Sequence, residues 1–222
     1  MTSEIYKNTV LKCEKCGGQG ILYNTKVYDK HSKLNDVIMC DCTKEMFRQL
    51  RLEKAGVPKN FWIFPKFSDS ILKYLYTLID DWDNIILCGP IQTGKSTYAA
   101  KILELWLDKM NVTGMDKEVG AKWLSLYELA SLSKSFNYEE LNKASTIWNL
   151  DILVLDEVVP QALIRKFTLE DLYFRIKNRV ESTKKTAITT LISPSKFEEY
   201  LGPMLSGLLV EAFKIVDSRL IV

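Results

Sequence analysis

The chain has 222 residues, a formal net charge of +2 at pH 7 and 47% hydrophobic residues. This length suits one α/β domain with a small appendage, and a net charge near zero points to no particular class of partner. No apolar run is long enough to span a bilayer, and the N-terminal MTSEIYKNTV lacks the layout of a signal peptide. We therefore expect a cytoplasmic protein without membrane contact, whose thiols stay reduced.

Cysteines dominate the first segment of the chain. Two close pairs, CEKC and CDC, supply Cys13, Cys16, Cys40 and Cys42. Four thiolates from such pairs can bind one zinc ion in a tetrahedral site, and the glycines of GGQG suit the turn after the first pair. Unpaired reduced thiols and a redox C-x-x-C are the alternatives. We predict a zinc-knuckle domain with a following helix over residues 1–55, which needs the metal for its folding energy.

We expect neither His31 nor Cys88 to be a ligand of the zinc ion. His31, the single histidine, is expected in an exposed loop, since four thiols already complete the zinc site. Cys88 lies in an apolar run and is expected to be a small core residue.

Residues 56–83 are predicted to form a linker and a leading helix. Gly56 and Pro58 end the preceding helix, and VPKNFWIFPKF is expected to be an extended connector. Its aromatic side chains, Phe61, Trp62 and Phe64, are expected to pack against the domain that follows. The segment SILKYLYTLIDDW has apolar residues at helical spacing.

From residue 84 to residue 222, apolar runs of strand length alternate with helical patterns. Strands are predicted at 84–88, at the start of AKWLSLYEL, in DILVLDE, in TAITTLIS and in FKIVD. Helices are predicted from 95 to about 110, in LYELASLSKSF, in YEELNKASTIW, and at 167–183 and 203–212. This α/β alternation predicts a parallel sheet flanked by helices, with right-handed crossovers.

A phosphate-binding loop follows the first of these strands. The segment GPIQTGKS matches G-x-x-x-x-G-K-[ST] without a substitution and lies between a predicted strand and a predicted helix. Its glycines let successive N–H groups point at one anion, and the helix adds its positive N-terminal end. We assign nucleotide binding to Gly89, Pro90, Ile91, Gln92, Thr93, Gly94, Lys95, Ser96 and Thr97.

The side chains around this loop have distinct expected roles. Lys95 reaches the β- and γ-phosphates of a nucleoside triphosphate, and the Ser96 hydroxyl is a magnesium ligand. The run ILVLDE supplies two acids at the end of another predicted strand. Asp156 is expected to hold Mg²⁺ and Glu157 to polarise the attacking water. An acidic cap on an exposed strand end is the alternative for this pair.

The C-x-x-C…C-x-C knuckle, GVPKNFW, the phosphate loop and LVLDE together resemble the DnaC/DnaI-type replicative helicase loaders. The runs IWNLDILVLDEV and YFRIKNRVESTKKTAITT are also similar to that family, whose ATPase domain is related to the IstB-type transposition ATPases. The resemblance implies a P-loop NTPase fold, with an AAA+ ATPase core over residues 84–222 and no full C-terminal lid. It implies ATP and Mg²⁺ as ligands, self-association on ATP or DNA, contact with single-stranded DNA, and a zinc domain that binds the helicase.

The chain departs from the family's pattern in two places. The family strand usually ends in T-S-N, whereas this chain has Thr189, Thr190 and Leu191, which leaves Thr190 to contact the phosphate or the water. Gly207 stands where the family tends to carry an arginine that completes a neighbouring subunit's site. Arg219 is a candidate replacement, and a surface arginine is the alternative. Loss of such an arginine can slow hydrolysis by several orders of magnitude.

The sequence therefore predicts an ATP-dependent helicase loader in DNA replication, in a short form that suits a phage or a plasmid. It is expected to hydrolyse ATP to ADP and phosphate and to deliver or remodel a replicative helicase. The alternatives are an IstB-like transposition ATPase, a nucleotide-binding adaptor with little or no hydrolysis, and a small-molecule kinase.

Contact with single-stranded DNA has its own sequence signal. Basic residues in predicted loops or at helix ends lie near two aromatic residues, a combination that suits phosphates and base faces. An ordinary solvated surface is the alternative. The residues are Lys134, Lys143, Arg165, Lys166, Phe136 and Tyr138.

Overall fold

The computed structural model describes residues 4–23, 37–63, 65–110, 120–133, 135–159 and 169–221. The chain divides into two compact units, Met1–Lys54 and Ala55–Val222. Several residues with sequence-based expectations lie outside the described residues, namely His31, Phe64, Lys134, Arg165 and Lys166. Among the described segments, no helix combines the length and the apolar character needed to cross a membrane.

The first unit is small and is built around the cysteines. A two-stranded antiparallel sheet pairs Ile21 with Met39, so the two cysteine pairs flank the hairpin's strands. Cys16 and Cys40 are buried, together with Val10 and Leu52. The elements of this unit are α1 (Glu4–Thr9), β1 (Ile21–Tyr23), β2 (Val37–Met39) and α2 (Asp41–Ala55).

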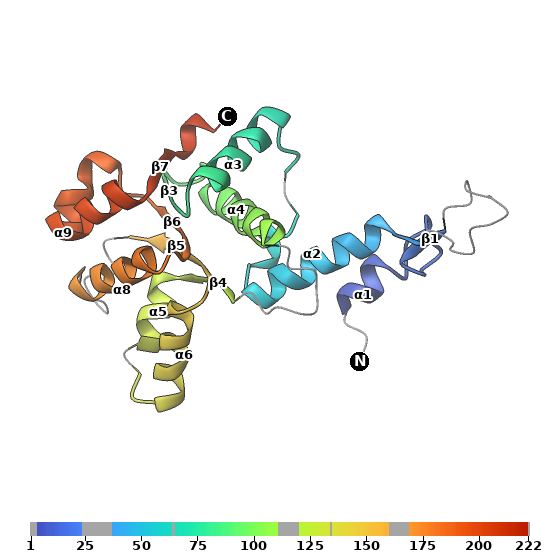
Figure 1. The fold of residues 1–222 in the computed structure, drawn as a ribbon, viewed down its shortest axis with the longest axis horizontal. Coiled ribbons are helices and arrows are strands. Elements are labelled where there is room, and N and C mark those ends of the chain that lie inside the picture. The colour runs from blue at the N-terminus through green and yellow to red at the C-terminus, as the bar shows by residue number, and fades with distance from the viewer. Residues whose placement is uncertain are drawn as a thin grey trace. The chain divides into compact units, whose positions relative to one another are not determined.

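The second unit contains a five-stranded sheet in the order β4-β5-β6-β3-β7, and every neighbouring pair is parallel (Figure 1). The predicted parallel sheet is thus confirmed. β3 is buried at every position, as expected for a strand covered on both faces. The strands are β3 (Asn84–Cys88), β4 (Ala121–Ser125), β5 (Ile152–Val158), β6 (Lys185–Thr190) and β7 (Lys214–Asp217).

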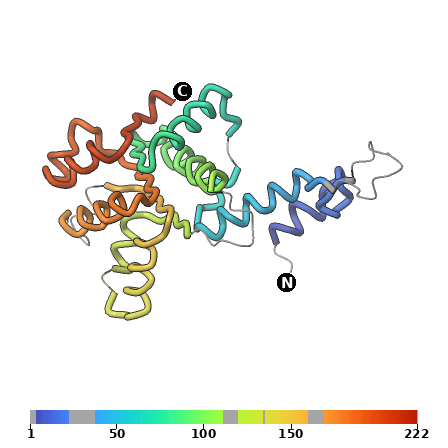
Figure 2. Tube along the Cα trace, in the orientation of Figure 1, coloured from blue at the N-terminus to red at the C-terminus, as the bar shows by residue number. Residues whose placement is uncertain are grey.

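Helices cover both faces of this sheet, as the tube trace also shows (Figure 2). Most of the long helices fall where the sequence predicted them. The α-helices are α3 (Asp69–Asp81), α4 (Lys95–Lys109), α5 (Leu126–Ser133), α6 (Tyr138–Trp148), α8 (Leu169–Glu181) and α9 (Phe197–Ala212). Short 3-10 turns are η1 (Lys59–Phe61), η2 (Pro194–Lys196) and η3 (Ser218–Leu220).

The main core of the second unit lies between the sheet and the helices α5, α6, α8 and α9. One buried cluster joins Ile86 of β3 and Leu155 of β5 to side chains from all four of these helices. α4 packs against the strands and against α3, and buries Trp106 completely. The sheet is therefore packed against helices on both faces.

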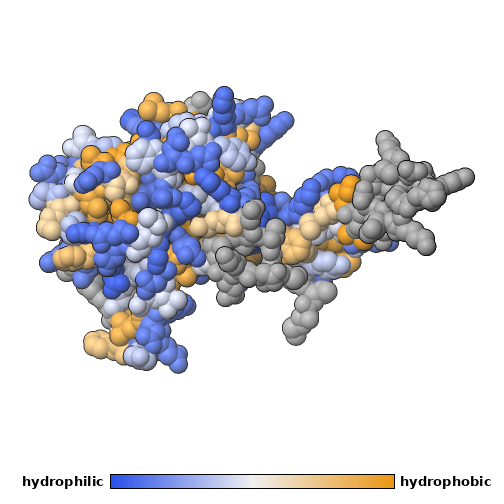
Figure 3. Space-filling model, viewed as in Figure 1, coloured by the Kyte–Doolittle hydropathy of each residue, from blue (hydrophilic) through white to orange (hydrophobic). Residues whose placement is uncertain are grey.

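The last long helix extends beyond its prediction. The predicted helix over 203–212 forms the second part of α9, which begins at Phe197 and is interrupted at Gly202, where φ is +71°. Gly202 and Pro203 carry the signals of a helix end, and here the chain resumes its helix immediately after them. Apolar side chains reach the surface over this region (Figure 3), where Met204 and Val210 are each 60% exposed.

Candidate functional site

The phosphate-loop sequence forms a tight turn between β3 and α4. Three of its residues have positive φ: Gly89 at +147°, Gln92 at +65° and Gly94 at +76°. Gly94 is the N-cap of α4 in the left-handed conformation, which glycine adopts without strain. A Cβ atom at Gly89 would lie 2.4 Å from Ser218 Oγ, so the first glycine is required for a close approach as well.

Lys95 lies at the start of α4 and turns back into this loop. Its side chain is only 9% exposed, and Nζ donates a hydrogen bond to Pro90 O at 2.5 Å. Burial lowers the pKa of the Lys95 ammonium, and the neighbouring Asp156 carboxylate acts in the opposite sense. The ammonium therefore lies inside the loop, where the carbonyl oxygen of Pro90 occupies a position that a phosphate oxygen could take.

Ser96 and Asp156 are brought into direct contact from α4 and β5. The Ser96 hydroxyl donates to Asp156 Oδ1 at 3.0 Å. A hydroxyl and a carboxylate at this distance are the oxygen ligands that Mg²⁺ prefers beside substrate phosphates. Thr97, the last residue assigned to nucleotide binding, lies in the same first turn of α4.

Thr189 joins this pair, although no sequence motif pointed to it. Its hydroxyl donates to Asp156 Oδ1 at 2.5 Å and accepts a hydrogen bond from Glu157 N at 2.9 Å. The side chain is 1% exposed, at the C-terminal end of β6. One sequence feature could have indicated such a role: two threonines end a predicted buried strand, and buried hydroxyls need hydrogen-bond partners.

Glu157 owes its orientation to an irregularity in β5. The pairing of β5 with β6 shifts register between Leu155 and Val158, and Glu157 has a φ of +57°. Such a bulge re-aims a side chain at the end of a strand. The Glu157 side chain is exposed, whereas Asp156 is 9% exposed. The two neighbouring acids thus occupy different environments, as a magnesium ligand and a water-activating group would need.

Thr190 lies in the same region, but its hydroxyl is engaged with the backbone. It donates to Val158 O at 2.6 Å and accepts from Ile192 N at 3.1 Å. The side chain is 3% exposed. A contact of Thr190 with phosphate or water, which the sequence analysis expected, would require this hydroxyl to give up Val158 O.

A cavity of about 430 Å³ opens where these strand ends meet. It brings together the phosphate loop, Glu157 of β5 and the end of β6, which the sequence places far apart. The lining residues are Ile91, Gln92, Lys95, Ser96, Glu157, Val159, Thr189, Thr190 and Leu191.

The first unit contains a separate cluster of four sulfur atoms. The Sγ atoms of Cys13, Cys16, Cys40 and Cys42 all lie within 4.8 Å of one another. Cys13 Sγ is 3.9 Å from Cys40 Sγ, and Cys16 Sγ is 3.5 Å from Cys42 Sγ. Four thiolates about 2.3 Å from one zinc ion would be separated by about 3.8 Å, so this donor set fits tetrahedral zinc. Gly20 N also donates to Cys16 Sγ at 3.2 Å, which stabilises a thiolate there.

Comparison with solved structures identifies the type of fold. No protein-family model matches the chain, and no curated protein sequence matches it. Among solved structures, DnaI has a TM-score of 0.57 at 14% identity, covering 72% of this chain and 94% of that one. The DnaC helicase loader has a TM-score of 0.52 at 17% identity, covering 72% and 99%. AMPPCP-bound DnaA from Aquifex aeolicus has a TM-score of 0.53 at 13% identity, covering 70% and 47%. The chain has an AAA+ fold.

The predicted fold class is therefore confirmed: the fold is of the AAA+ type, and the first unit contains a four-cysteine cluster that could bind zinc. Within this AAA+ fold, the second departure noted in the sequence, the missing arginine, has a structural counterpart. A Cβ at Gly207, on α9, would meet no atom within 4 Å, so the position faces open space. Arg219 pairs with Asp217 of its own chain, with the two side chains 2.5 Å apart.

Proposed function

We propose that this protein is an ATP-dependent loader or remodeller of a replicative helicase, and that it hydrolyses ATP at the cavity beside the phosphate loop. One observation carries the proposal: Lys95, Ser96 and Glu157 line that cavity on an AAA+ fold, and the Ser96 hydroxyl is bonded to the buried Asp156. Phosphate binding, magnesium binding and water activation need these groups. The similar folds of DnaI and the DnaC helicase loader support a helicase as the partner.

Triphosphate binding would use the loop's N–H groups, the N-terminus of α4 and Lys95. The ammonium of Lys95 would leave Pro90 O for the β- and γ-phosphates, a charge-assisted contact stronger than its present one. Ser96 and Asp156 would hold Mg²⁺, which would neutralise charge on the phosphates. The AMPPCP bound to DnaA supports a triphosphate as the ligand of this fold.

Glu157 would position the water that attacks the γ-phosphate. Its exposed carboxylate lines the cavity, and the bulge in β5 turns it away from the buried Asp156. The carboxylate accepts a proton from the water as the oxygen attacks phosphorus, and ADP and phosphate are released. Thr189 would keep Asp156 in place throughout, because its hydroxyl donates to that carboxylate.

The test is ATP turnover by the purified chain, with and without single-stranded DNA, beside a Glu157→Gln variant. DNA-stimulated turnover that disappears in the variant is the expected result, because glutamine cannot accept the proton. Turnover that is equal in the variant and the wild type would contradict the role of Glu157. Co-purification of a tagged chain with a replicative helicase, and with a transposase as the comparison, separates a loader from an IstB-like ATPase.

A nucleotide-binding adaptor with little hydrolysis is the second candidate, and two observations favour it. The Thr190 hydroxyl is bound to Val158 O, and Arg219 is bound to Asp217 of its own chain. Neither group is therefore directed at a nucleotide phosphate of its own or a neighbouring chain. Nucleotide binding without turnover, with DNA present or absent, would select the adaptor.

Contact with single-stranded DNA is proposed at the start of α6. Phe136 is fully exposed and Tyr138 is 76% exposed, with Lys143 exposed on the same helix. Stacking on such rings contributes about 1–3 kcal/mol per base. The double variant Phe136→Ala, Tyr138→Ala should weaken binding of a labelled oligo-dT at least tenfold. The matched control is Tyr76→Ala on α3, whose side chain is 52% exposed, and equal loss in both would refute the assignment.

Two further partners belong to the proposal. The zinc-binding unit would contact the helicase, as the resemblance to helicase loaders implies, and the chain would self-associate on ATP or DNA. Light scattering with and without ATP and DNA measures the second point. A particle that stays monomeric under every condition would exclude self-association as part of the mechanism.

A further inference from the structure

A short turn after the last strand lies against the phosphate loop. Ser218, the first residue of η3, is 2% exposed, and its hydroxyl donates to Cys88 O at 3.1 Å. The same hydroxyl lies 2.6 Å from Thr93 Oγ1. Cys88 is the residue just before the phosphate loop and Thr93 lies near the loop's end, so one buried hydroxyl joins both ends of the loop.

The number of donors decides which hydroxyl donates to which acceptor in these contacts. Pro90 O accepts from Lys95 Nζ at 2.5 Å and also lies 2.9 Å from Thr93 Oγ1, so it has a donor even when the threonine proton is directed elsewhere. Thr93 can then donate to Ser218, and Ser218 to Cys88 O. Lys95 Nζ also reaches Thr93 Oγ1 at 3.5 Å. A chain of hydrogen bonds thus connects the lysine of the loop to the C-terminal turn.

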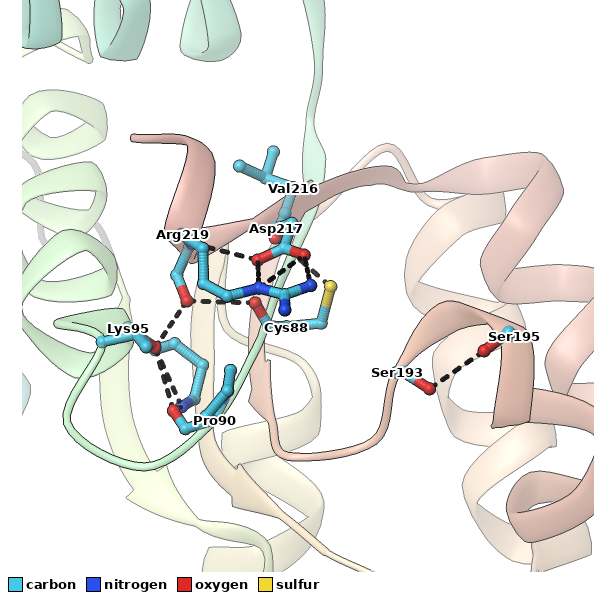
Figure 4. A network of polar contacts seen from close by, with 10 residues as sticks. Cys88, Pro90, Lys95, Ser193, Ser195, Val216, Asp217 and Arg219 are labelled. Atoms are coloured by element: carbon cyan, nitrogen blue, oxygen red, sulfur yellow. Dashed lines mark hydrogen bonds and ion pairs between the residues drawn. The ribbon is translucent and has the colours of Figure 1, made fainter. Parts of the chain in front are cut away.

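Other contacts hold the C-terminal turn in position. Asp217 accepts hydrogen bonds from Arg219 N and Arg219 Nε, each at 3.0 Å, which closes the turn around Ser218. The Tyr98 hydroxyl, from α4, donates to Ile221 O at 2.8 Å. Figure 4 shows Arg219 alongside Asp217, close to the loop that carries Pro90 and Lys95. The turn is therefore fixed to its own strand and to the helix that follows the phosphate loop.

We propose that Ser218 is a positioning residue of the nucleotide site: its hydroxyl holds Thr93 and Cys88 so that the phosphate loop keeps the shape that binds a nucleoside triphosphate. This inference rests on the proposed function. Steric contact supports it, because a Cβ at Gly89 would approach Ser218 Oγ to 2.4 Å. The turn and the loop backbone thus pack without space for a larger group, and a change at Ser218 reaches the loop directly.

The experiment is a double-mutant cycle on the dissociation constant for Mg²⁺–AMPPCP, with Ser218→Ala, Thr93→Val and the double variant. Removing one hydrogen bond of this kind should raise the constant about fivefold to tenfold in Ser218→Ala. Because Ser218 acts in part through Thr93, the loss of affinity in the double variant should be smaller than the sum of the losses in the two single variants. Ser193→Ala, which removes an exposed hydroxyl paired with Ser195, is the control and should bind as the wild type does.

Each outcome decides between a positioning role and a purely structural one. Ser218→Ala with a lower melting temperature but an unchanged dissociation constant would overturn the inference, as would fully additive effects in the cycle. If Ser218→Ala does not fold, Ser218→Cys keeps nearly the same volume with a weaker donor and replaces it in the cycle. Absence of binding by the wild type would refute the proposed function as well, whereas binding with no effect at Ser218 refutes this inference alone.

Discussion

The hydroxyl of Thr189 donates a hydrogen bond to Asp156 Oδ1 at 2.5 Å, across the neighbouring strands β6 and β5. The same oxygen accepts from Ser96 Oγ at 3.0 Å. One carboxylate oxygen is therefore oriented by two hydroxyls from two different elements. A magnesium ion would take the place of one of these donors, while the other would keep the carboxylate oriented.

Thr189→Val should therefore raise the Mg²⁺ concentration that ATP turnover requires. Valine keeps the shape of threonine but cannot donate, so Asp156 loses a partner that orients it. We expect the Mg²⁺ concentration for half-maximal ATP turnover to rise about threefold to tenfold. Thr77→Val, which removes a hydroxyl on the exposed face of α3, is the control. An unchanged magnesium requirement in Thr189→Val would show that Ser96 alone is sufficient.

The four-cysteine cluster should bind one zinc ion per chain and require it for folding of its unit. Cys16→Ser should lose the zinc and part of the far-ultraviolet circular dichroism, since metal binding supplies folding energy in such small units. All five tryptophans lie in Ala55–Val222, so their fluorescence reports on the other unit and should keep its unfolding transition.

Zinc content is measured with a chromogenic chelator after the thiols are released. Cys88→Ala is the matched control, because Cys88 is a buried cysteine of the sheet and lies outside the cluster. Full zinc content in Cys16→Ser, or none in the wild type, would contradict the assignment of these ligands.

Arg179 should be a major contributor to the stability of the second unit. It is 2% exposed, and its guanidinium donates to Trp148 O, Leu150 O and Lys185 O at 2.7–2.8 Å and to Thr186 Oγ1 at 3.0 Å. Burial lowers the pKa of this guanidinium to about 10, so it stays charged at neutral pH. Arg179→Met leaves these acceptors without their donor and should reduce the free energy of unfolding by about 3–5 kcal/mol.

Urea unfolding followed by tryptophan fluorescence measures this loss. Lys177→Met on the same helix removes an exposed cation whose ion pair with Glu181 spans 3.8 Å, and should change stability by less than about 0.5 kcal/mol. A loss of under about 1 kcal/mol in Arg179→Met would mean that water replaces the guanidinium.

The stability of the folded protein should depend on pH through the Asp217 carboxyl, and the direction of this dependence follows from its pKa. Hydrogen bonds from the Arg219 side chain and backbone lower the pKa of the Asp217 carboxyl from 3.8 to about 2. A lowered pKa in the folded state favours folding when the carboxyl is charged in both states, and this contribution is lost as the pH falls from about 4 to about 2. Asp217→Asn should therefore be less stable than the wild type at pH 6.

The difference in stability between the wild type and Asp217→Asn should shrink as the pH falls below about 4, because the unfolded wild type then takes up a proton at Asp217. Urea midpoints measured at pH 6, 4 and 3 test this. A difference that is the same at all three values would mean that the charge of Asp217 contributes nothing and that only the shape of the turn matters.

Local motifs predicted which side chains come together at the candidate site, because each of these groups belongs to a short segment. The run GPIQTGKS gives the turn between a strand and a helix, and the buried apolar run before Asp156 gives a strand whose end faces the same edge. Apolar runs also gave the five strands of the sheet. These features depend on residues that are neighbours in sequence, so they can be recognised without the fold.

Contacts between distant segments could not be predicted in this way. Thr189 and Thr190 are adjacent in β6, and which hydroxyl meets Asp156 depends on the register shift in β5. Ser218 and Arg179 have ordinary sequence contexts, and their partners come from other elements of the sheet. Gly202 and Pro203 carry the signals of a helix end and the helix does break at Gly202, but the helical segment from Phe197 to the break packs on the same core and was not predicted.

Binding of Mg²⁺–AMPPCP by the wild-type chain, measured by calorimetry beside Lys95→Ala, tests whether this AAA+ fold has a working nucleotide site. We expect one site per chain in the wild type and an affinity at least tenfold lower in Lys95→Ala, because a charged hydrogen bond to phosphate is lost. Lys73→Ala, which removes an exposed lysine of α3, should bind as the wild type does. Equal affinities of the wild type and Lys95→Ala, or no binding by the wild type, would contradict the assignment of the site.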